Sequence, residues 1–289
     1  MPTPQLLKDK PLSLLQIIIL AAVQGAAELL PVSSSAHVIV AEKLMGLDPT
    51  APAMTLLLVM LHTGTMFAVI TYFWSAWRRT YFSSWAAFKQ QAAWVVLATA
   101  ATGIVGLGLL KLINHLMLPS HPHFEIEQLF GNTRIISIAL GLAGLLILAA
   151  ARLPEGQGRE PGPRGALWIG LVQGLCLPFR GFSRSGATIS TGLVLGLNRR
   201  SAEEFSFALA VALTPVVIVK ELLRLLKAQG AALHSAGAVH LLAPSLLGML
   251  FSYIAGLLAL RWLSSWLEAG RWAYFGLYCL LAAAAVAWL

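Results

Sequence analysis

A polar segment between Gln24 and His37 interrupts the first long apolar run of the sequence. Gln24 and Glu28 are four positions apart, which places both side chains on one face of a helix. Pro31 disfavours helical geometry at Leu30, so that helix is expected to end there, inside the apolar zone. Ionisable side chains in hydrocarbon are costly and are functional candidates by default. The segment therefore predicts a helix that breaks within a membrane, with functional groups at the break.

Three consecutive serines, Ser33, Ser34 and Ser35, follow the break. Serine is favoured at helix N-caps, so a second helix is expected to begin here, with His37 in its first turn. The free backbone N–H groups of a helix start attract anions. The first break is thus expected to combine a carboxylate, hydroxyls and an imidazole beside an anion-binding helix end.

A related pattern occurs in the second half of the chain, from Gln173 to Thr188. A Gln-Gly pair again leads to a proline, Pro178, and then to a serine-rich segment. The first serine follows the glutamine by nine positions in the first copy and by ten in the second, so the repeat has slipped by one residue. The second copy supplies cations, Arg180 and Arg184, where the first supplies Glu28 and His37. Brought together, the two copies would form a site that handles phosphate.

The composition indicates a polytopic membrane protein with one integrated domain, residues 1–289. Hydrophobic residues make up 58% of the 289 residues and charged residues only 11%, which is too apolar for a water-soluble core. The net charge is +8, but the basic residues stand at the ends of apolar segments, where membrane topology explains them. We therefore expect no nucleic-acid partner.

The remaining apolar segments predict an all-α fold with six transmembrane helices and two re-entrant helix hairpins. A polar linker at 153–164 separates two repeats, 11–152 and 165–289. Three crossings lie between the hairpins, so the hairpins must enter from opposite faces, as in an inverted-topology repeat. The hairpins are expected at 14–45 and 165–197, and the spans at 54–77, 92–113, 130–151, 204–226, 240–263 and 272–289.

The basic residues also predict an orientation. Short loops rich in Lys and Arg stay in the cytoplasm, so the first of two sets is assigned there, with both termini outside and the first hairpin entering from the outer face. The first set is Arg78, Arg79, Lys89, Arg152, Arg159, Arg164, Arg199, Arg200, Arg261 and Arg271, and the second is Lys8, Lys10, Lys43, Lys111, Arg134, Lys220, Arg224 and Lys227.

Each candidate residue also has an alternative interpretation, in which it stabilises the fold and has no catalytic or binding role. Arg184 can bind phosphate oxygens through its planar, bidentate guanidinium, but it could instead be a snorkelling residue beside a helix cap. Glu28 could simply form a buried ion pair with Arg184 or Arg180. His37 alone would more often be a satisfied buried histidine, whereas beside the serines it is a candidate general base or phosphoryl acceptor.

Four motifs together resemble the undecaprenyl-diphosphate phosphatase family, also called the bacitracin-resistance proteins. The similarity runs through nearly the whole chain. The motifs are Gln-Gly-Ala-Ala-Glu at 24–28 with Leu-Pro-Val-Ser-Ser-Ser-Ala-His at 30–37, Leu-His-Thr-Gly-Thr at 61–65, Gly-Phe-Ser-Arg-Ser-Gly-Ala-Thr at 181–188 and Glu-Phe-Ser-Phe at 204–207. The resemblance implies an enzyme of the bacterial inner membrane that removes the terminal phosphate of undecaprenyl diphosphate and so recycles the lipid carrier of cell-wall synthesis.

The resemblance also implies a site that opens to the outer face and needs a divalent cation, Mg²⁺ or Ca²⁺. The expected catalytic residues are Glu28, Ser34, His37 and Arg184, with Glu28 and Gln24 holding the metal. Either Ser34 or His37 could be the nucleophile, and direct attack by a metal-bound water is a third route. The expected substrate-binding residues are Ser33, Ser35, Ser183, Ser185, Thr188 and Arg180.

Three positions depart from the pattern that the resemblance implies. Family members commonly have glutamate where Gln24 stands, glycine where Ala36 stands, and a Trp-Pro-Gly turn where this chain has 178–181 with one extra residue. Arg180 could add a second phosphate clamp or simply reshape the turn. Two rival functions are a transporter or lipid flippase and an inactive lipid-binding relative. Bacitracin would compete by sequestering the substrate, and a homodimer is compatible with this interpretation.

Overall fold

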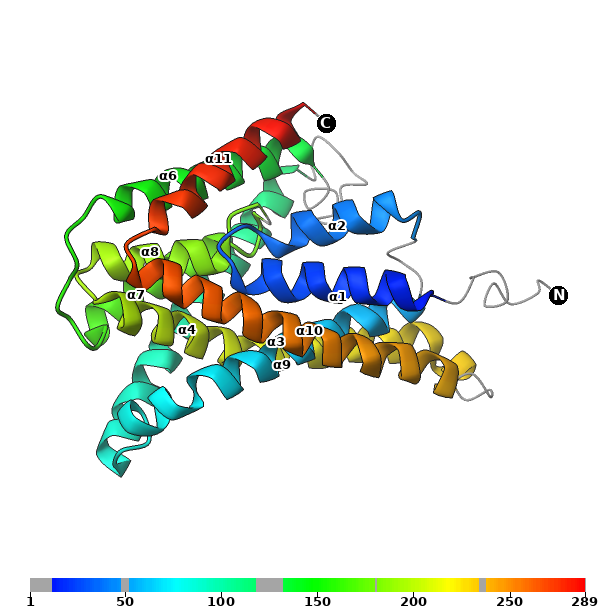
Figure 1. The fold of residues 1–289 in the computed structure, drawn as a ribbon, viewed down its shortest axis with the longest axis horizontal. Coiled ribbons are helices and arrows are strands. Elements are labelled where there is room, and N and C mark those ends of the chain that lie inside the picture. The colour runs from blue at the N-terminus through cyan, green and yellow to red at the C-terminus, as the bar shows by residue number, and fades with distance from the viewer. Residues whose placement is uncertain (1–11, 48–51, 118–131, 180, 234–237, 289) are drawn as a thin grey trace.

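The computed structural model describes residues 12–47, 52–117, 132–179, 181–233 and 238–288. Within these ranges the regular elements are helices, and the only β-type pairing is an isolated bridge between Gly158 and Leu197. The predicted all-α fold is therefore confirmed. The helices, shown in Figure 1, are α1 (Leu14–Leu29), α2 (Ser34–Leu44), α3 (Pro52–Thr80), α4 (Trp85–Met117), α6 (Thr133–Ala151), α7 (Gly162–Leu175), α8 (Arg184–Val194), α9 (Arg199–Leu233), α10 (Ala238–Glu268) and α11 (Trp272–Ala287).

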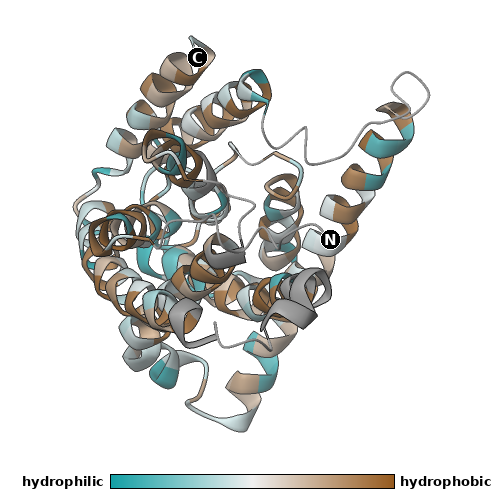
Figure 2. Ribbon diagram, turned by 90° about the vertical axis from the view of Figure 1, so that its right-hand side faces the viewer, coloured by the Kyte–Doolittle hydropathy of each residue, from teal (hydrophilic) through white to brown (hydrophobic). Residues whose placement is uncertain are grey.

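The long helices present apolar side chains to the outside as well as to the core. Ile104, Ile138 and Leu281 are 75%, 64% and 65% exposed, which suits lipid and would not suit water. Hydrophobic residues run along the long helices in Figure 2. In the described part of the chain, five helices are long and apolar enough to cross a membrane: α3, α4, α6, α9 and α10. The expected sixth span, α11, is apolar but has only 16 residues. The protein is thus a multi-pass membrane protein.

Several helices extend beyond the predicted spans. The expected span at 92–113 is the middle of α4, which has 33 residues and begins at Trp85. The hydropathy pattern identifies only the section of the helix that is apolar enough to lie in lipid. The helix itself continues into the interface, where aromatic and basic side chains such as Trp85 and Lys89 are favoured. Pro215 and Pro244 lie inside α9 and α10, and neither ends its helix. The first two residues of the expected span at 130–151 lie outside the described residues.

The first break occurs where the sequence predicts it. α1 ends at Leu29, and Leu30 is extended, with φ −69° and ψ 150°. The Val32 N–H then donates to the Leu30 carbonyl at 2.8 Å, which closes a tight turn around Pro31. α2 has 11 residues, or roughly 16 Å of helix, and is too short to cross about 30 Å of hydrocarbon. In Figure 1 α1 and α2 lie side by side as a hairpin. Whether this hairpin and the α7/α8 pair re-enter the membrane stays a prediction.

The two Gln-Gly pairs have a packing explanation. α1 packs against α10, and α7 packs against α4, so the first helix of each expected repeat contacts the fourth helix of the other. A Cβ atom at Gly25 would come within 2.6 Å of the Ala255 Cβ, and one at Gly174 within 2.7 Å of the Val105 Cβ. Each glycine therefore allows a close helix approach beside its glutamine. The repeat boundaries themselves, 11–152 and 165–289, stay predictions.

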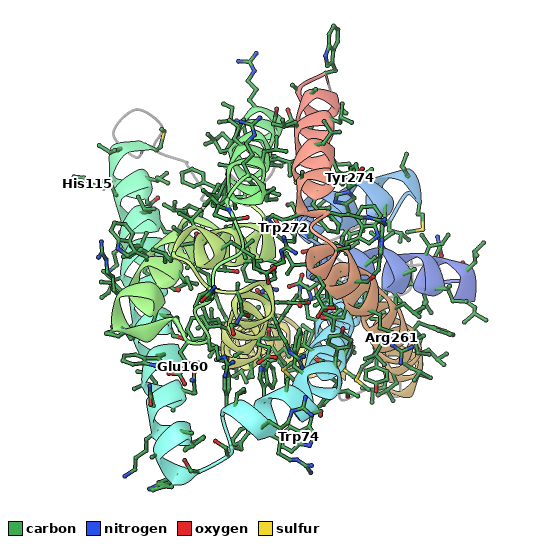
Figure 3. All side chains as sticks on the ribbon, turned by 60° about the vertical axis from the view of Figure 1, so that its left-hand side comes forward. Trp74, His115, Glu160, Arg261, Trp272 and Tyr274 are labelled. Atoms are coloured by element: carbon green, nitrogen blue, oxygen red, sulfur yellow. The ribbon has the colours of Figure 1, made fainter. Side chains whose placement is uncertain are left out.

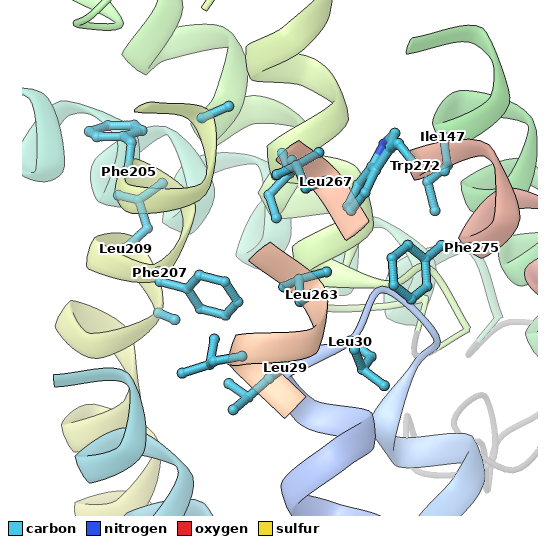
Figure 4. Close-up of a cluster of buried hydrophobic side chains, with 14 of the residues drawn as sticks. Leu29, Leu30, Ile147, Phe205, Phe207, Leu209, Leu263, Leu267, Trp272 and Phe275 are labelled. Carbon is cyan, nitrogen blue, oxygen red and sulfur yellow. The ribbon is translucent and has the colours of Figure 1, made fainter. Parts of the chain in front are cut away.

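A continuous apolar core joins both halves. Leu29 and Leu30, at the end of α1, belong to the same buried cluster as Phe207 of α9, Leu263 of α10 and Phe275 of α11 (Figure 4). The ring of Phe207 also stacks on Phe73 of α3, with a centroid separation of 5.3 Å. The first break is thus held on apolar side chains from helices of both halves.

Several helix ends meet around Arg199, at the end of the molecule where α9 begins. Arg199 Nη1 donates to the Glu268 carbonyl at 2.8 Å and lies 3.3 Å from Glu155 Oε2, while Gln90 Nε2 donates to Glu160 Oε2 at 2.8 Å. Figure 3 shows Glu160 and Trp74 toward one end of the molecule and His115 at the opposite end of α4. These contacts tie the expected linker, 153–164, to α4, α9 and α10, and its last three residues already belong to α7.

The glycine contacts predict opposite outcomes for two substitutions on the α4–α7 helix pair. A Cβ at Gly170 would overlap the backbone of Ala98, so Gly170→Ala must push α7 off α4 and should cost about 1–3 kcal/mol of stability. Gly103 has no atom within 4 Å of its expected Cβ, so Gly103→Ala should be neutral or stabilise by up to about 1 kcal/mol. Thermal unfolding in detergent measures both, and equal midpoints would contradict this packing.

Candidate active site

The two helix breaks meet, although they are far apart in the sequence. Glu28, in the last turn of α1, lies 3.4 Å from Arg184 at the start of α8, measured from Oε1 to Nη2, and the two residues are 156 positions apart. Next to this ion pair, the Ser185 hydroxyl donates to the Leu30 carbonyl at 3.2 Å. The structure thus brings together the acidic and the basic segment that the sequence analysis expected to combine.

Glu28 is the centre of the polar contacts. Its Oε2 atom accepts a hydrogen bond from the Ser34 hydroxyl at 2.7 Å and one from Gln24 Nε2 at 3.3 Å. The same oxygen lies 3.8 Å from Nε2 of His62 on α3. The side chain of Glu28 is 21% exposed and that of His62 is 37% exposed. The arrangement pairs a serine hydroxyl with a carboxylate that can accept its proton, at a place that a ligand can reach.

Arg184 uses only part of its hydrogen-bonding capacity. Its Nη2 atom faces Glu28, and its guanidinium carbon lies 5.9 Å from the centre of the Phe207 ring. Its Nη1 atom is buried and has no hydrogen-bond partner among the described residues. Buried donors are normally satisfied, so an unsatisfied one beside a carboxylate and a hydroxyl is suited to an anionic ligand.

His37 faces away from this centre. Its Nδ1 atom bonds to the Ser33 carbonyl at 2.8 Å, and its Nε2 atom lies 2.5 Å from the Tyr278 hydroxyl of α11. The His37 and Tyr278 rings also stack, with centroids 5.9 Å apart. The structure therefore places His37 next to α11 and brings a different histidine, His62, to Glu28.

Two expected substrate-binding residues support α8. Ser183 is the N-cap of α8, and its hydroxyl accepts from the Gly186 N–H at 3.3 Å. Thr188 is fully buried, donates to the Arg184 carbonyl at 2.8 Å and is bonded to the Ser206 hydroxyl at 2.6 Å. These bonds fix the start of α8 and so hold Arg184 in place.

The other expected substrate-binding residues are less defined. Ser33 is the N-cap of α2 by position, but its side chain makes no capping hydrogen bond. Ser35 belongs to the first turn of α2, and its side chain lies outside the described part of the structure. Arg180 also lies outside the described residues. The substrate contacts of all six expected residues stay predictions.

Two residues at the site were not selected from the sequence. His62 is an ionisable residue in the middle of an apolar span, so the criterion that selected Glu28 also applies to it. Tyr278 carries no comparable signal, because tyrosine is common in apolar helices near interfaces. Only the tertiary structure, which brings Tyr278 of α11 to His37 of α2, shows this contact.

The sequence matches the family described as bacitracin resistance protein BacA over residues 17–285. It is 62% identical over 274 residues to Undecaprenyl-diphosphatase 2 of Acinetobacter baylyi, covering 93% of this chain and 95% of that protein. It is also 36% identical over 286 residues to Undecaprenyl-diphosphatase 2 of Burkholderia thailandensis and to Undecaprenyl-diphosphatase 1 of Burkholderia pseudomallei, covering 94% of this chain and 95% of each relative. The chain belongs to the bacitracin resistance protein BacA family.

The polar groups of this BacA-family site can be tested against the expected cation. No group of three or more His, Cys, Asp or Glu side chains capable of holding a metal occurs in the described part of the chain. Glu28 and Gln24 nevertheless provide a carboxylate and an amide in contact, and Mg²⁺ is often held by one carboxylate together with the phosphates of its substrate. The residues therefore fit an ion that is bound jointly with a diphosphate.

The break of this BacA-family chain also contains backbone strain. Ser33 has φ 67° and ψ 91° and is the one non-glycine residue with positive φ in the described ranges. Its carbonyl accepts the hydrogen bond from His37 Nδ1. Such a conformation costs on the order of 1–3 kcal/mol in a residue with a Cβ atom, and it persists only where the surroundings impose it.

A pair of substitutions separates the strain at Ser33 from the role of its hydroxyl. Both Ser33→Gly and Ser33→Ala remove the hydroxyl, but only glycine relieves the Cβ strain at positive φ. We expect Ser33→Gly to be more stable than Ser33→Ala by about 1 kcal/mol in thermal unfolding. An alanine variant as stable as the glycine variant would show that the turn is not strained. An equal loss of activity in both variants would point to the hydroxyl.

Proposed function

We propose that this protein hydrolyses undecaprenyl diphosphate to undecaprenyl phosphate and inorganic phosphate, so that the lipid carrier of bacterial cell-wall synthesis is recycled. The observation that carries the proposal is the hydrogen bond from the Ser34 hydroxyl to Glu28 Oε2, at 2.7 Å, beside Arg184 from the other half of the chain. Membership of the BacA family, with relatives named undecaprenyl-diphosphatase, supports the choice of substrate. Activity against the diphosphate also accounts for bacitracin resistance.

The reaction begins with the Ser34–Glu28 pair. Glu28 Oε2 takes the hydroxyl proton while Ser34 Oγ attacks the terminal phosphorus, and the bond from that phosphorus to the bridging oxygen breaks. Undecaprenyl phosphate leaves, and the terminal phosphoryl group stays on Ser34. Water then attacks the same phosphorus, which releases inorganic phosphate and returns the hydroxyl to Ser34. Phosphoryl transfer depends mainly on such positioning and on charge neutralisation.

Arg184 supplies positive charge to the phosphoryl group. Its Nη1 atom has no partner among the described residues, so it can donate to a phosphate oxygen without breaking the contact between Nη2 and Glu28. Ser183, Ser185 and Thr188 hold the start of α8 through their own bonds, which keeps the guanidinium in place. A divalent cation, Mg²⁺ or Ca²⁺, held by Glu28 and Gln24 together with the diphosphate, would neutralise further charge when bound.

The geometry favours Ser34 over His37 as the nucleophile. Both ring nitrogens of His37 already have partners, the Ser33 carbonyl and the Tyr278 hydroxyl, whereas Ser34 bonds directly to a base. Attack by a water molecule with Glu28 as its base is a second route that uses the same residues. A variant with Ser34 replaced by alanine separates the two routes, because it would retain activity only in the second.

The site is further proposed to open to the outer face of the inner membrane. The support is a set of arginines at the ends of α3, α6 and α9, which the positive-inside rule assigns to the cytoplasm: Arg78, Arg79, Arg152, Arg199 and Arg200. Competition by bacitracin, which would sequester the substrate, is expected to act from the same outer side. That the protein forms a homodimer also remains a prediction.

Purified protein is expected to release inorganic phosphate from a prenyl diphosphate in the presence of Mg²⁺ or Ca²⁺. This release of phosphate is expected to stop when the cation is chelated.

Arg184→Lys keeps the charge but loses the planar fork, so it should lower turnover by about a hundredfold. Phosphate assays on wild type and variant, with circular dichroism as the control for folding, measure this. Folded wild-type protein that releases no phosphate with any metal would instead support a transporter or an inactive lipid-binding relative.

The orientation predicts which side of the membrane Ser34 can be reached from. In a protein with Cys176→Ala and Cys279→Ser, a Ser34→Cys variant should react in intact cells with a thiol reagent that cannot cross the membrane. Ser83→Cys, in the exposed turn between α3 and α4, is the matched control and should react only after the cells are opened. The reverse pattern would show that the protein has the opposite orientation in the membrane.

A further inference from the structure

We propose that Phe207 is a positioning residue, which holds the Arg184 guanidinium in the orientation that binds the phosphoryl group. Phe207 is the last residue of the motif Glu-Phe-Ser-Phe at 204–207, which lies on α9 and not on either helix break. The proposal rests on the function proposed above and adds to it a residue that acts through Arg184. It is carried by the contacts of the Phe207 ring and of the neighbouring Ser206 hydroxyl.

The Phe207 ring lies next to the charged end of Arg184. The guanidinium carbon lies over the ring, 5.9 Å from its centre, which is within the range of a cation–π interaction. Phe207 is fully buried, and the Arg184 side chain is only 20% exposed. The attraction between a cation and the negative face of an aromatic ring is stronger where water is excluded. The contact therefore restricts how the guanidinium can turn.

A contact with an aromatic ring leaves the hydrogen-bond donors of the guanidinium free. The ring attracts the positive charge and does not require a hydrogen bond from any particular N–H group. Nη2 of Arg184 faces Glu28, whereas Nη1 is buried and has no partner among the described residues. A hydrogen-bonding side chain in place of Phe207 would occupy a donor that the phosphoryl group needs. Phe207 thus accounts for an arginine that is held in place and still has an unused donor.

The Phe207 ring is itself fixed by aromatic packing. It stacks on Phe73 of α3, with a centroid separation of 5.3 Å and an interplanar angle of 25°, and Phe73 stacks on Trp77 at 5.7 Å. Trp77 Nε1 donates to the carbonyl of Glu204, the first residue of the same motif, at 3.3 Å. α3 and α9 therefore hold the ring between them, and it forms a rigid support for the guanidinium.

Ser206, the neighbour of Phe207, holds the backbone of Arg184. The Thr188 hydroxyl donates to the Arg184 carbonyl at 2.8 Å, and it lies 2.6 Å from the Ser206 hydroxyl. A hydroxyl has a single proton to donate, so Ser206 is the donor in the bond between the two hydroxyls. Two successive residues of α9 thus act on the two ends of Arg184, its backbone and its guanidinium.

The contact with Glu28 alone holds the guanidinium less firmly. The distance from Nη2 to Oε1 is 3.4 Å, which is longer than the about 2.7–2.9 Å of an ordinary charge-assisted hydrogen bond. The Glu28 carboxylate also accepts hydrogen bonds from Ser34 and Gln24, so Arg184 shares it with other groups of the site. The Phe207 ring has no polar group of its own, and its contact with Arg184 is unaffected by such competition.

The test compares kcat and KM for phosphate release by purified Phe207→Leu and Phe205→Leu proteins. Both phenylalanines are fully buried, but residues two positions apart on a helix do not face each other, and in Figure 4 only the Phe207 ring points toward Leu263. Phe207→Leu should lower kcat by about tenfold and leave KM nearly unchanged, because a misplaced guanidinium mainly affects the transition state. Phe205→Leu is the matched control and should retain the wild-type kcat.

A second measurement separates the charge distribution of the ring from its volume. Fluorinated phenylalanines at position 207 draw electron density away from the ring face and change its size little, so kcat should fall with each added fluorine. The same substitutions at position 205 should have no effect. In an Arg184→Lys protein, Phe207→Leu should lower kcat by a smaller factor than in the wild type, because the planar fork that the ring orients is already lost.

The possible results separate this inference from the function on which it rests. An active wild type together with equal kcat values for Phe207→Leu and Phe205→Leu would overturn the role of Phe207. A fluorinated series of unchanged kcat would overturn it as well and show that the ring acts by packing alone. A folded wild type without activity would overturn the proposed function and this inference with it. If Phe207→Leu does not fold, the fluorinated proteins, which keep the shape of the ring, provide the same kinetic comparison.

Discussion

The ion pair between Glu28 and Arg184 is the interaction on which the site depends. Each charge stands at a helix break in an apolar region, and neither has a strong counter-ion in its own helix hairpin. Leaving one such charge unpaired by removing its partner costs roughly 3–5 kcal/mol. The two halves of the chain therefore stabilise each other, because Arg184 of the second half balances the charge of Glu28 in the first half.

The apolar packing around this pair holds the two helix breaks next to each other. Gly25 and Gly174 let α1 and α7 approach α10 and α4 closely, and Leu29 and Leu30 anchor the first break in the common core. The positive φ of Ser33 is a local cost that this packing sustains. In return, the turn directs the Ser33 carbonyl to His37 and places Ser34 one residue later, against Glu28.

The site combines fixed groups with available ones. Ser183, Ser185 and Thr188 use their hydroxyls inside the protein, and His37 is held by Tyr278. The Arg184 Nη1 atom has no partner in the described chain, and the Nε2 atom of His62 has none within hydrogen-bonding distance there. In a preorganised site of this kind the free-energy cost of reorganisation on binding a charged substrate is small, because the dipoles are already oriented.

The local features of this protein could be read from the sequence alone. Apolar composition determined the membrane class, Pro31 determined the end of α1, and the spacing of Gln24 and Glu28 determined their contact, since each depends only on neighbouring residues. Family membership was also accessible from the motifs. The choice between the two histidines was not, because it depends on the rotation of α3 and α11 about their axes. Only the tertiary packing, which closes contacts across 156 positions between Glu28 and Arg184 and across 241 between His37 and Tyr278, decided which side chains face each other.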